Sequence, residues 1–189
     1  PLMRVSHVKA NCRTLIGILA EAGKRIREVN ALDRDDFDAA HGRLTIRKGK
    51  FGKSREVPLH PTTVAALDGY LRRDDRPHHA GMPTLLISST GKRLRYTVVQ
   101  PIFHKLLHHC GIAPRSAACR PRIHDLRHSF AVSTIADDYR SGDPGSRLAI
   151  LSTYLGHADP ADTYWYLSAA PELLALAGER LERHLAGDA

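Results

Sequence analysis

Several features are scarce in this sequence of 189 residues, and each scarcity excludes a class of protein. The cysteines are Cys12, Cys110 and Cys119, an odd number without framework spacing, so we expect reduced thiols and a cytoplasmic protein. No apolar run approaches the roughly 20 residues that span a bilayer, and no basic-then-apolar leader opens the chain. Nothing resembles a P-loop, which argues against the use of ATP.

Acidic residues are also in deficit, and this bias is informative. Lysine and arginine number 28 against 20 aspartates and glutamates, which gives a formal charge of +8 and a pI of about 9.7. Such a surface attracts polyanions, of which nucleic acid is the commonest, and an anionic membrane is the rival partner. The lack of a spanning run disfavours the membrane. The length suits one well-filled domain.

The spacing of apolar residues predicts an α+β fold that is mainly α-helical, with a small antiparallel β-sheet. Period-two alternation between Leu44 and Leu59, interrupted by a turn over residues 49–52, predicts a β-hairpin with a basic tip, and Leu85 to Ser88 is a candidate third strand. Helical spacing predicts the other elements. They are helices over 12–22 and 25–32, one from Pro61, one over 97–110 that opens with a capping box, one from His124 past Ile135, one from Pro144 to Leu155, a short one after Pro160 and a terminal one from Pro171.

Six side chains form a set that could attack a phosphodiester with a tyrosine. A phosphoryl group in transfer carries negative charge on its non-bridging oxygens, and arginine can hold these with two parallel hydrogen bonds. A tyrosine hydroxyl, with a pKa of about 10, becomes a nucleophile only when its surroundings stabilise the phenolate. Each residue alone has an ordinary explanation, such as a solvated helix face or a half-buried ring, and it is their order that favours chemistry. They are Arg25, Lys50, His124, Arg127, His157 and Tyr166.

The order and setting of these residues resemble the catalytic domain of the tyrosine recombinases, also called the phage integrase family. The segment from Gly23 to Glu28 matches the family's Gly-x-Arg-x-x-Glu pattern, although Arg27 stands where a small hydroxyl residue is usual. Lys50 lies on the predicted hairpin turn, shortly before a Val-Pro-Leu segment, as the family's lysine does. The remaining matches are His-x-x-Arg at 124–127, Leu-Gly-His at 155–157 and a tyrosine nine residues after that histidine.

The resemblance implies the DNA breaking-rejoining fold and a site-specific recombinase or integrase. Residues 1–189 would form one catalytic domain, without the N-terminal core-binding domain that the family usually carries. Tyr166 would form a 3′-phosphotyrosyl link, with no metal, ATP or other cofactor. Arg25 and Arg127 would hold the phosphate, and Lys50 would protonate the leaving 5′ oxygen. His124 would assist proton transfer from the tyrosine, and His157 would hydrogen-bond the phosphate.

The expected partner is double-stranded DNA, with four protomers assembled on it in the nucleoid. Glu28 and Asp125 are expected to orient the cationic groups. One concave basic surface is expected to be lined by Arg25, Lys50, His124, Arg127 and His157. Additional phosphate contacts are expected from six residues around the site. They are Lys92, Arg93, Arg95, Arg115, Arg120 and Arg122.

Two other functions and one structural choice stay open. A non-catalytic DNA-binding module would also suit the charge and the helices, and a metal site could be drawn from neighbouring side chains on one helix, namely His104, His108, His109 and Cys110. The terminal helix carries an apolar stripe that packs either on its own core or on a neighbouring protomer. The stripe consists of Leu173, Leu174, Ala177, Leu181 and Leu185.

Overall fold

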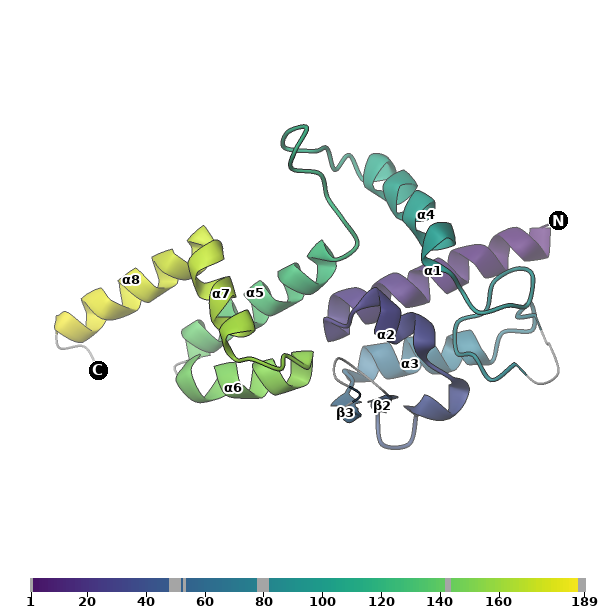
Figure 1. Cartoon of the computed structure of the whole chain (residues 1–189), viewed down its shortest axis with the longest axis horizontal. Coiled ribbons are helices and arrows are strands. Elements are labelled where there is room, and N and C mark those ends of the chain that lie inside the picture. The colour runs from purple at the N-terminus through teal and green to yellow at the C-terminus, as the bar shows by residue number, and fades with distance from the viewer. Residues whose placement is uncertain (1, 48–51, 53, 78–81, 142–143, 187–189) are drawn as a thin grey trace. The chain divides into compact units, whose positions relative to one another are not determined.

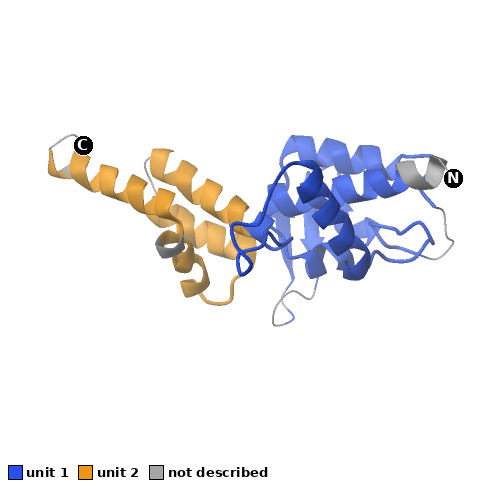
Figure 2. Cartoon of the chain, turned by 90° about the horizontal axis from the view of Figure 1, so that it is seen from above, with its two compact units in different colours: residues 1–127 blue, residues 128–189 orange. Residues whose placement is uncertain are grey.

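The computed structural model describes residues 2–47, 52, 54–77, 82–141 and 144–186, and Figure 1 follows them along the chain. Contacts divide the chain into two compact units, residues 1–127 and 128–189, coloured separately in Figure 2. The structure is mostly helical with one small antiparallel sheet, which confirms the predicted fold class. Within the described residues, no helix is both long and apolar enough to cross a membrane.

Unit 1 opens with a helix longer than the sequence predicts. Helix α1 (Leu2–Ala22) begins well before residue 12, because its first half buries polar side chains that carry no apolar signal. His7 and Asn11 are almost fully buried, and both hydrogen-bond the carbonyl of Ile87, at 2.7 and 2.9 Å. The helix ends at Gly23, whose φ of 56° is left-handed and favours glycine. Helix α2 (Ile26–Ala31) follows where it was predicted.

The sheet of unit 1 contains the predicted hairpin. A short 3-10 turn, η1 (Arg34–Asp36), leads into β1 (Phe37–Asp38), β2 (Arg43–Ile46) and β3 (Arg55–Pro58), which pair antiparallel in the order β1-β2-β3. Leu44 lies opposite Val57, and both side chains are fully buried, as the period-two pattern requires. Most of the hairpin tip, including Lys50, lies outside the described residues.

The prediction of a third strand at Leu85–Ser88 was wrong, because the third strand of the sheet is β1. Thr84 and Ile87 form only isolated bridges, to Asp33 and Arg93. The three residues 85–87 are all buried in succession, so this segment does not expose one face and bury the other as a strand of a one-sided sheet does. It is an irregular buried segment held by main-chain bonds such as Leu85 N–H to the carbonyl of Leu32, at 2.9 Å.

Two further helices complete unit 1. Helix α3 (Pro61–Leu71) packs on α1 and buries Leu67 and Tyr70. Helix α4 (Tyr96–His109) begins at Tyr96, and the capping residue before it makes no side-chain cap bond, so the predicted capping box is wrong. The predicted apolar stripe of α4 is present in part, since Val99 and Phe103 are buried while Leu106 is exposed.

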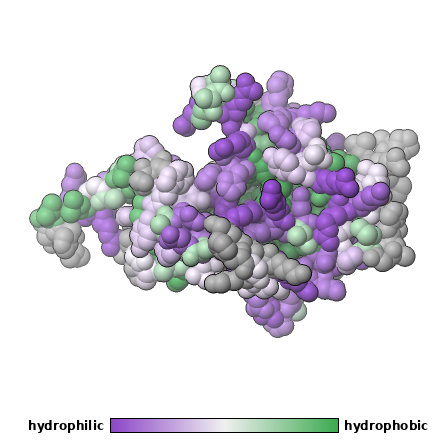
Figure 3. Space-filling model, viewed as in Figure 1, coloured by the Kyte–Doolittle hydropathy of each residue, from purple (hydrophilic) through white to green (hydrophobic). Residues whose placement is uncertain are grey.

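Unit 2 is a small helical bundle. It consists of most of α5 (Asp125–Ser141), together with α6 (Pro144–Leu155), α7 (Ala161–Ala169) and α8 (Pro171–Leu185). Its core includes Ile135, Leu151, Leu155, Tyr166 and Leu173. On α8 only part of the predicted apolar stripe is covered, and Figure 3 shows hydrophobic atoms on the surface of this helix. The exposed leucines are Leu174, Leu181 and Leu185, with 56%, 58% and 76% of each accessible.

Candidate functional site

The first predicted cation, Arg25, is held by the predicted supporting residue Glu28. Arg25 lies in the link between α1 and α2, and its backbone N–H donates to Glu28 Oε2 at 3.0 Å. Its guanidinium also donates to Glu28 Oε1, at 3.4 Å. A third donor is Arg55 on β3, whose Nη2 lies 3.0 Å from the same Oε1. One carboxylate therefore fixes two arginines, one from the helix link and one from the hairpin.

The environment of Glu28 keeps its carboxylate charged. Burial by itself would raise the pKa of Glu28, but the hydrogen bond from the Arg25 N–H and the charge of Arg55 outweigh that effect, and the net pKa is lowered. The side chain is only 7% exposed, so solvent screens these interactions little. Glu28 is thus a fixed anion in a group of cations.

The second predicted arginine, Arg127, belongs to the same neighbourhood. Its side chain is 2% exposed, and Nη1 donates to the carbonyl of Gly23 at 2.7 Å. Gly23 is two residues from Arg25, so this bond ties the start of α5 to the link that carries the first arginine. Within unit 1, the structure therefore brings together Arg25, Glu28 and Arg127, residues separated by up to 102 positions (127 − 25).

A buried lysine completes this group. Lys24 is 1% exposed, and burial, followed by the charge of Arg55, lowers its pKa to about 6. Arg127 and Arg25 lower it further, and Glu28 acts in the opposite direction. Arg25 and Arg55 bond one carboxylate, and Lys24 lies within the electrostatic influence of both and of Arg127. Such a group of positive charges favours the binding of an added anion.

Two more predicted residues of unit 1, His124 and Asp125, lie at the start of α5. His124 is exposed immediately before α5, and its carbonyl accepts the N–H of Arg127 at 3.0 Å. Asp125, the first residue of α5, accepts the backbone N–H of Arg122 at 2.8 Å and its guanidinium at 3.3 Å. Asp125 therefore supports the helix start, where a negative charge is favourable.

In unit 2 the predicted tyrosine lies in an aromatic group. Tyr166 is 4% exposed, and its ring stacks on that of His157 with 6.3 Å between centroids and 14° between planes. The ring of His128 approaches Tyr166 edge-on at 5.5 Å, and Trp165 does so at 5.6 Å. A short hydrogen bond also belongs to this group, since His157 Nδ1 lies 2.7 Å from the hydroxyl of Thr163.

The six residues predicted to contact DNA differ in their surroundings. Lys92, Arg95, Arg115, Arg120 and Arg122 are exposed. Arg93 is instead bound within the fold, because its guanidinium donates to the carbonyls of Asn30 and Leu32 at 3.0 and 3.1 Å and to Asp33 at 2.5 Å. These three bonds indicate that Arg93 stabilises the fold.

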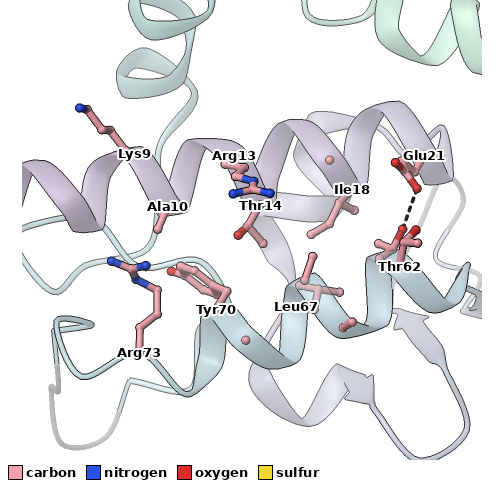
Figure 4. Close-up of a pocket in the computed structure, with 15 residues that line it drawn as sticks. Lys9, Ala10, Arg13, Thr14, Ile18, Glu21, Thr62, Leu67, Tyr70 and Arg73 are labelled. Carbon is pink, nitrogen blue, oxygen red and sulfur yellow. Dashed lines mark hydrogen bonds between the residues drawn. The ribbon is translucent and has the colours of Figure 1, made fainter.

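One cavity lies away from all of these residues. It holds about 640 Å³ between α1 and α3, and Figure 4 shows Lys9, Arg13 and Tyr70 among its lining. At one end Thr63 donates to Glu21 at 3.0 Å. None of the predicted catalytic residues is among those that line it.

The metal alternative gains no support. Among the described residues, no group of three or more histidines, cysteines and acidic residues is close enough to hold an ion. The four side chains considered for it, His104, His108, His109 and Cys110, lie on the exposed end of α4 or just after it.

Comparison with known proteins agrees with the motifs. The sequence pattern described as "Phage integrase family" matches residues 2–172. The chain belongs to the phage integrase family. A protein of Sinorhizobium fredii named "Putative integrase/recombinase y4rB" is 43% identical over 173 residues, which cover 89% of this chain and 55% of that protein. The tyrosine recombinase XerD of Mycobacterium tuberculosis is 33% identical over 158 residues, or 82% of this chain and 46% of its own.

Solved structures of the family share the fold. The crystal structure of XerH recombinase bound to its palindromic difH substrate, a post-cleavage complex, aligns with a TM-score of 0.71 and 26% identity, over 94% of this chain and 47% of that chain. The crystal structure of XerA recombinase also gives a TM-score of 0.71, at 24% identity, over 97% of this chain and 59% of that one. The chain thus spans about half the length of the relatives that it matches.

Four residues near the family motifs were not predicted from the sequence. They are Lys24, Arg55, His128 and Thr163. Thr163 could have been found, since it stands three residues before Tyr166 on one helix and therefore shares its face. The position of Arg55 two residues before the buried Val57 is a similar signal, because both residues then lie on one face of β3.

Proposed function

We propose that this chain is the catalytic domain, residues 1–189, of a site-specific DNA recombinase that cuts and rejoins double-stranded DNA through Tyr166. Membership of the phage integrase family supports the reaction class. The observation that supports the proposal most is the pairing of motif residues within each unit. Arg127 bonds the link that carries Arg25, and Tyr166 stacks on His157.

The proposed chemistry is two successive transesterifications. The Tyr166 hydroxyl attacks the scissile phosphorus, a tyrosyl–phosphate bond forms, and the bond to the 5′ oxygen breaks, leaving a 3′-phosphotyrosyl link and a 5′-hydroxyl. The 5′-hydroxyl of a second strand then attacks the link and releases the tyrosine. Each step exchanges one phosphate ester for another, so bond energy is conserved and ATP is not needed. The cationic side chains would supply the positive charge at the phosphate without a metal ion.

The cations would act on the charge that develops in the transition state. Arg25 and Arg127 would bind the non-bridging oxygens, and Glu28 would keep Arg25 oriented, as its two bonds to that residue suggest. Lys50 would give a proton to the departing 5′ oxygen. His124 would assist the loss of the tyrosine proton, with Asp125 stabilising the turn that carries it.

Phosphate contacts outside the site would come from exposed basic residues. We retain five of the six predicted ones and leave out Arg93, whose bonds lie within the fold. The five are Lys92, Arg95, Arg115, Arg120 and Arg122. We also propose that protomers assemble on DNA as a tetramer, since three leucines of α8 remain exposed within unit 2. DNA as substrate would place the protein in the cytoplasm, at the nucleoid.

A covalent-capture experiment tests the proposal even though the target sequence is not known. The chain is incubated with a pool of duplexes that carry a nick within a randomised segment. The short 5′-hydroxyl fragment diffuses away after cleavage, which traps the phosphotyrosyl link. Adducts are recovered under denaturing conditions, and their DNA is sequenced. We expect a defined sequence to be enriched in the adducts.

The matched controls are two tyrosines of one helix. Tyr166→Phe should abolish the adduct and leave DNA binding nearly intact, whereas Tyr164→Phe, at a position 56% exposed, should form it at the wild-type rate. An adduct formed by Tyr166→Phe would contradict the assignment and select Tyr164. Salt-dependent DNA binding without any adduct would favour the second candidate, a non-catalytic DNA-binding module, which the charge of +8 alone also supports.

A further inference from the structure

The contact between His157 and Thr163 has a definite chemical meaning. The Thr163 hydroxyl lies 2.7 Å from His157 Nδ1, and the Thr163 side chain is 1% exposed. Both residues belong to unit 2, Thr163 on α7 and His157 in the connection that precedes it. The bond is therefore shielded from water on the threonine side, where no solvent molecule can replace it easily.

Proton counting gives the direction of this bond. Among the described residues, the Thr163 hydroxyl forms its side-chain hydrogen bond with His157 Nδ1. A buried hydroxyl that only accepted a hydrogen bond would leave its own proton unsatisfied. The hydroxyl therefore donates, Nδ1 accepts through its lone pair, and the proton of the neutral imidazole resides on Nε2.

We infer that Thr163 is a positioning residue that holds His157 as the Nε2–H tautomer, ready to donate to a phosphate oxygen. This inference rests on the proposed function, in which His157 bonds the scissile phosphate. A neutral imidazole in the other tautomer would present a lone pair to an anionic oxygen and repel it. The bond from Thr163 disfavours that alternative before DNA arrives.

The same bond also fixes the plane of the imidazole. The His157 ring lies nearly parallel to that of Tyr166, at 14°, and Thr163 precedes Tyr166 by three residues on α7. Residues three apart on a helix project from one face. A single helix thus presents both the hydroxyl that orients the histidine and the tyrosine that stacks on it, so their relative positions depend on one rigid element.

Nitrogen NMR of the chain with ¹⁵N-labelled histidine tests the tautomer directly. A His157→Gln variant assigns the signals of His157 among those of the 12 histidines. We expect Nδ1 without a proton and Nε2 with one in the wild type, the same pattern in Thr163→Ser, and loss of that preference in Thr163→Val. A wild-type His157 protonated on Nδ1, or an unchanged pattern in Thr163→Val, overturns the inference. The wild-type spectrum decides it even if Thr163→Val does not fold.

The adduct assay tests the consequence for the reaction. Thr163→Val should form the covalent adduct about 10-fold more slowly, with DNA affinity unchanged, and Thr163→Ser should recover most of the rate. The combination of Thr163→Val with His157→Gln should be no slower than His157→Gln alone, because the threonine acts through the histidine. An additive loss in the double variant would overturn the positioning role.

Thr153 provides a matched control for Thr163. Thr153→Val on α6 removes a similar hydroxyl, which bonds only the carbonyl of Ala149 in the described structure, and should leave both readouts unchanged. A wild-type chain that forms no adduct would contradict the proposed function and with it the phosphate role of His157. The NMR spectrum is recorded without DNA, so it reports the tautomer independently of that failure.

Discussion

Arg127 donates a 2.7 Å hydrogen bond to the carbonyl of Gly23, a residue 104 positions earlier in the chain. The donor is almost completely buried, so the bond joins the start of α5 to the end of α1 without exposure to solvent. One arginine thus has a structural bond and a proposed catalytic bond at the same time. A guanidinium has five N–H groups, and one of those of Arg127 bonds the Gly23 carbonyl.

Substitution of Arg127 should therefore affect stability and cleavage together. Arg127→Ala leaves the Gly23 carbonyl without its donor and should lower the free energy of unfolding by about 1–3 kcal/mol, measured by urea denaturation. Formation of the covalent adduct should be lost. Arg127→Lys should keep part of the stability but not the cleavage, because an ammonium cannot bond two oxygens in the plane of a guanidinium. Arg72→Ala, at a 77% exposed side chain, is the control and should change neither.

Loss of the Glu28 charge should destabilise the fold in a pH-dependent way. The folded pKa of Glu28 is lowered below 4.5, so its contribution to stability is complete above that value and is lost as the pH falls through the folded pKa. Glu28→Gln should lower the unfolding free energy by about 1–3 kcal/mol at neutral pH. The difference from the wild type should shrink in acid. If the difference in unfolding free energy between the two proteins stays constant with pH, Glu28 stabilises the fold through its packing and not through its charge.

Lys24 should have the opposite effect on stability. Its folded pKa is about 6 and its ordinary value is 10.5, so between these values the unfolded chain binds more protons and the free energy of unfolding rises with pH. Lys24→Met, which keeps the chain length without the charge, should stabilise the protein more at about pH 6.5 than at about pH 9.5. Urea denaturation at both pH values measures this, and equal gains would argue that Lys24 is charged in the folded state.

The salt dependence of DNA binding should separate phosphate contacts from structural arginines. Arg120→Ala should weaken binding and reduce the slope of log K against log salt by about 0.9, the value for one phosphate contact. Arg93→Ala should leave the slope unchanged and lower stability, because it removes bonds to Asn30, Leu32 and Asp33. An unchanged slope for Arg120→Ala would remove that residue from the proposed DNA surface.

The exposed leucines of α8 should mediate association of protomers. Replacing Leu174, Leu181 and Leu185 by serine should lower self-association on DNA, measured by sedimentation, and lower recombination more than DNA binding. The free energy of unfolding should change little, since the stripe is exposed in unit 2. Leu173→Ser is the contrasting variant, because this side chain is 1% exposed in the core and its loss should unfold the bundle.

The sequence predicted those helices and strands whose apolar residues all lie on one face of the element. The hairpin of β2 and β3 and the helix α2 lie where period-two and helical spacing placed them. The first half of α1 was not predicted, because it is anchored by His7 and Asn11, polar residues whose burial depends on the distant Ile87 carbonyl. Burial of a polar group depends on its partner, and the partner is known only after the chain has folded.

The candidate site was predicted to a similar extent. Motif spacing selected Arg25, Glu28 and Arg127, and contacts within unit 1 link all three. The burial of Lys24 was not predictable, since a lysine after a glycine normally lies in water. One concave basic surface lined by Arg25, Lys50, His124, Arg127 and His157 stays a prediction.

The position of Tyr166 in the core of unit 2 has a consequence for the evolution of this domain. The ring packs with Leu155 and Leu173, so selection for folding acts on it even where selection for cleavage has ceased. A descendant that only binds DNA should therefore drift to phenylalanine at position 166 and retain the aromatic ring. Genomes carrying decayed copies of this domain would then record the loss of a single oxygen atom rather than the loss of the fold.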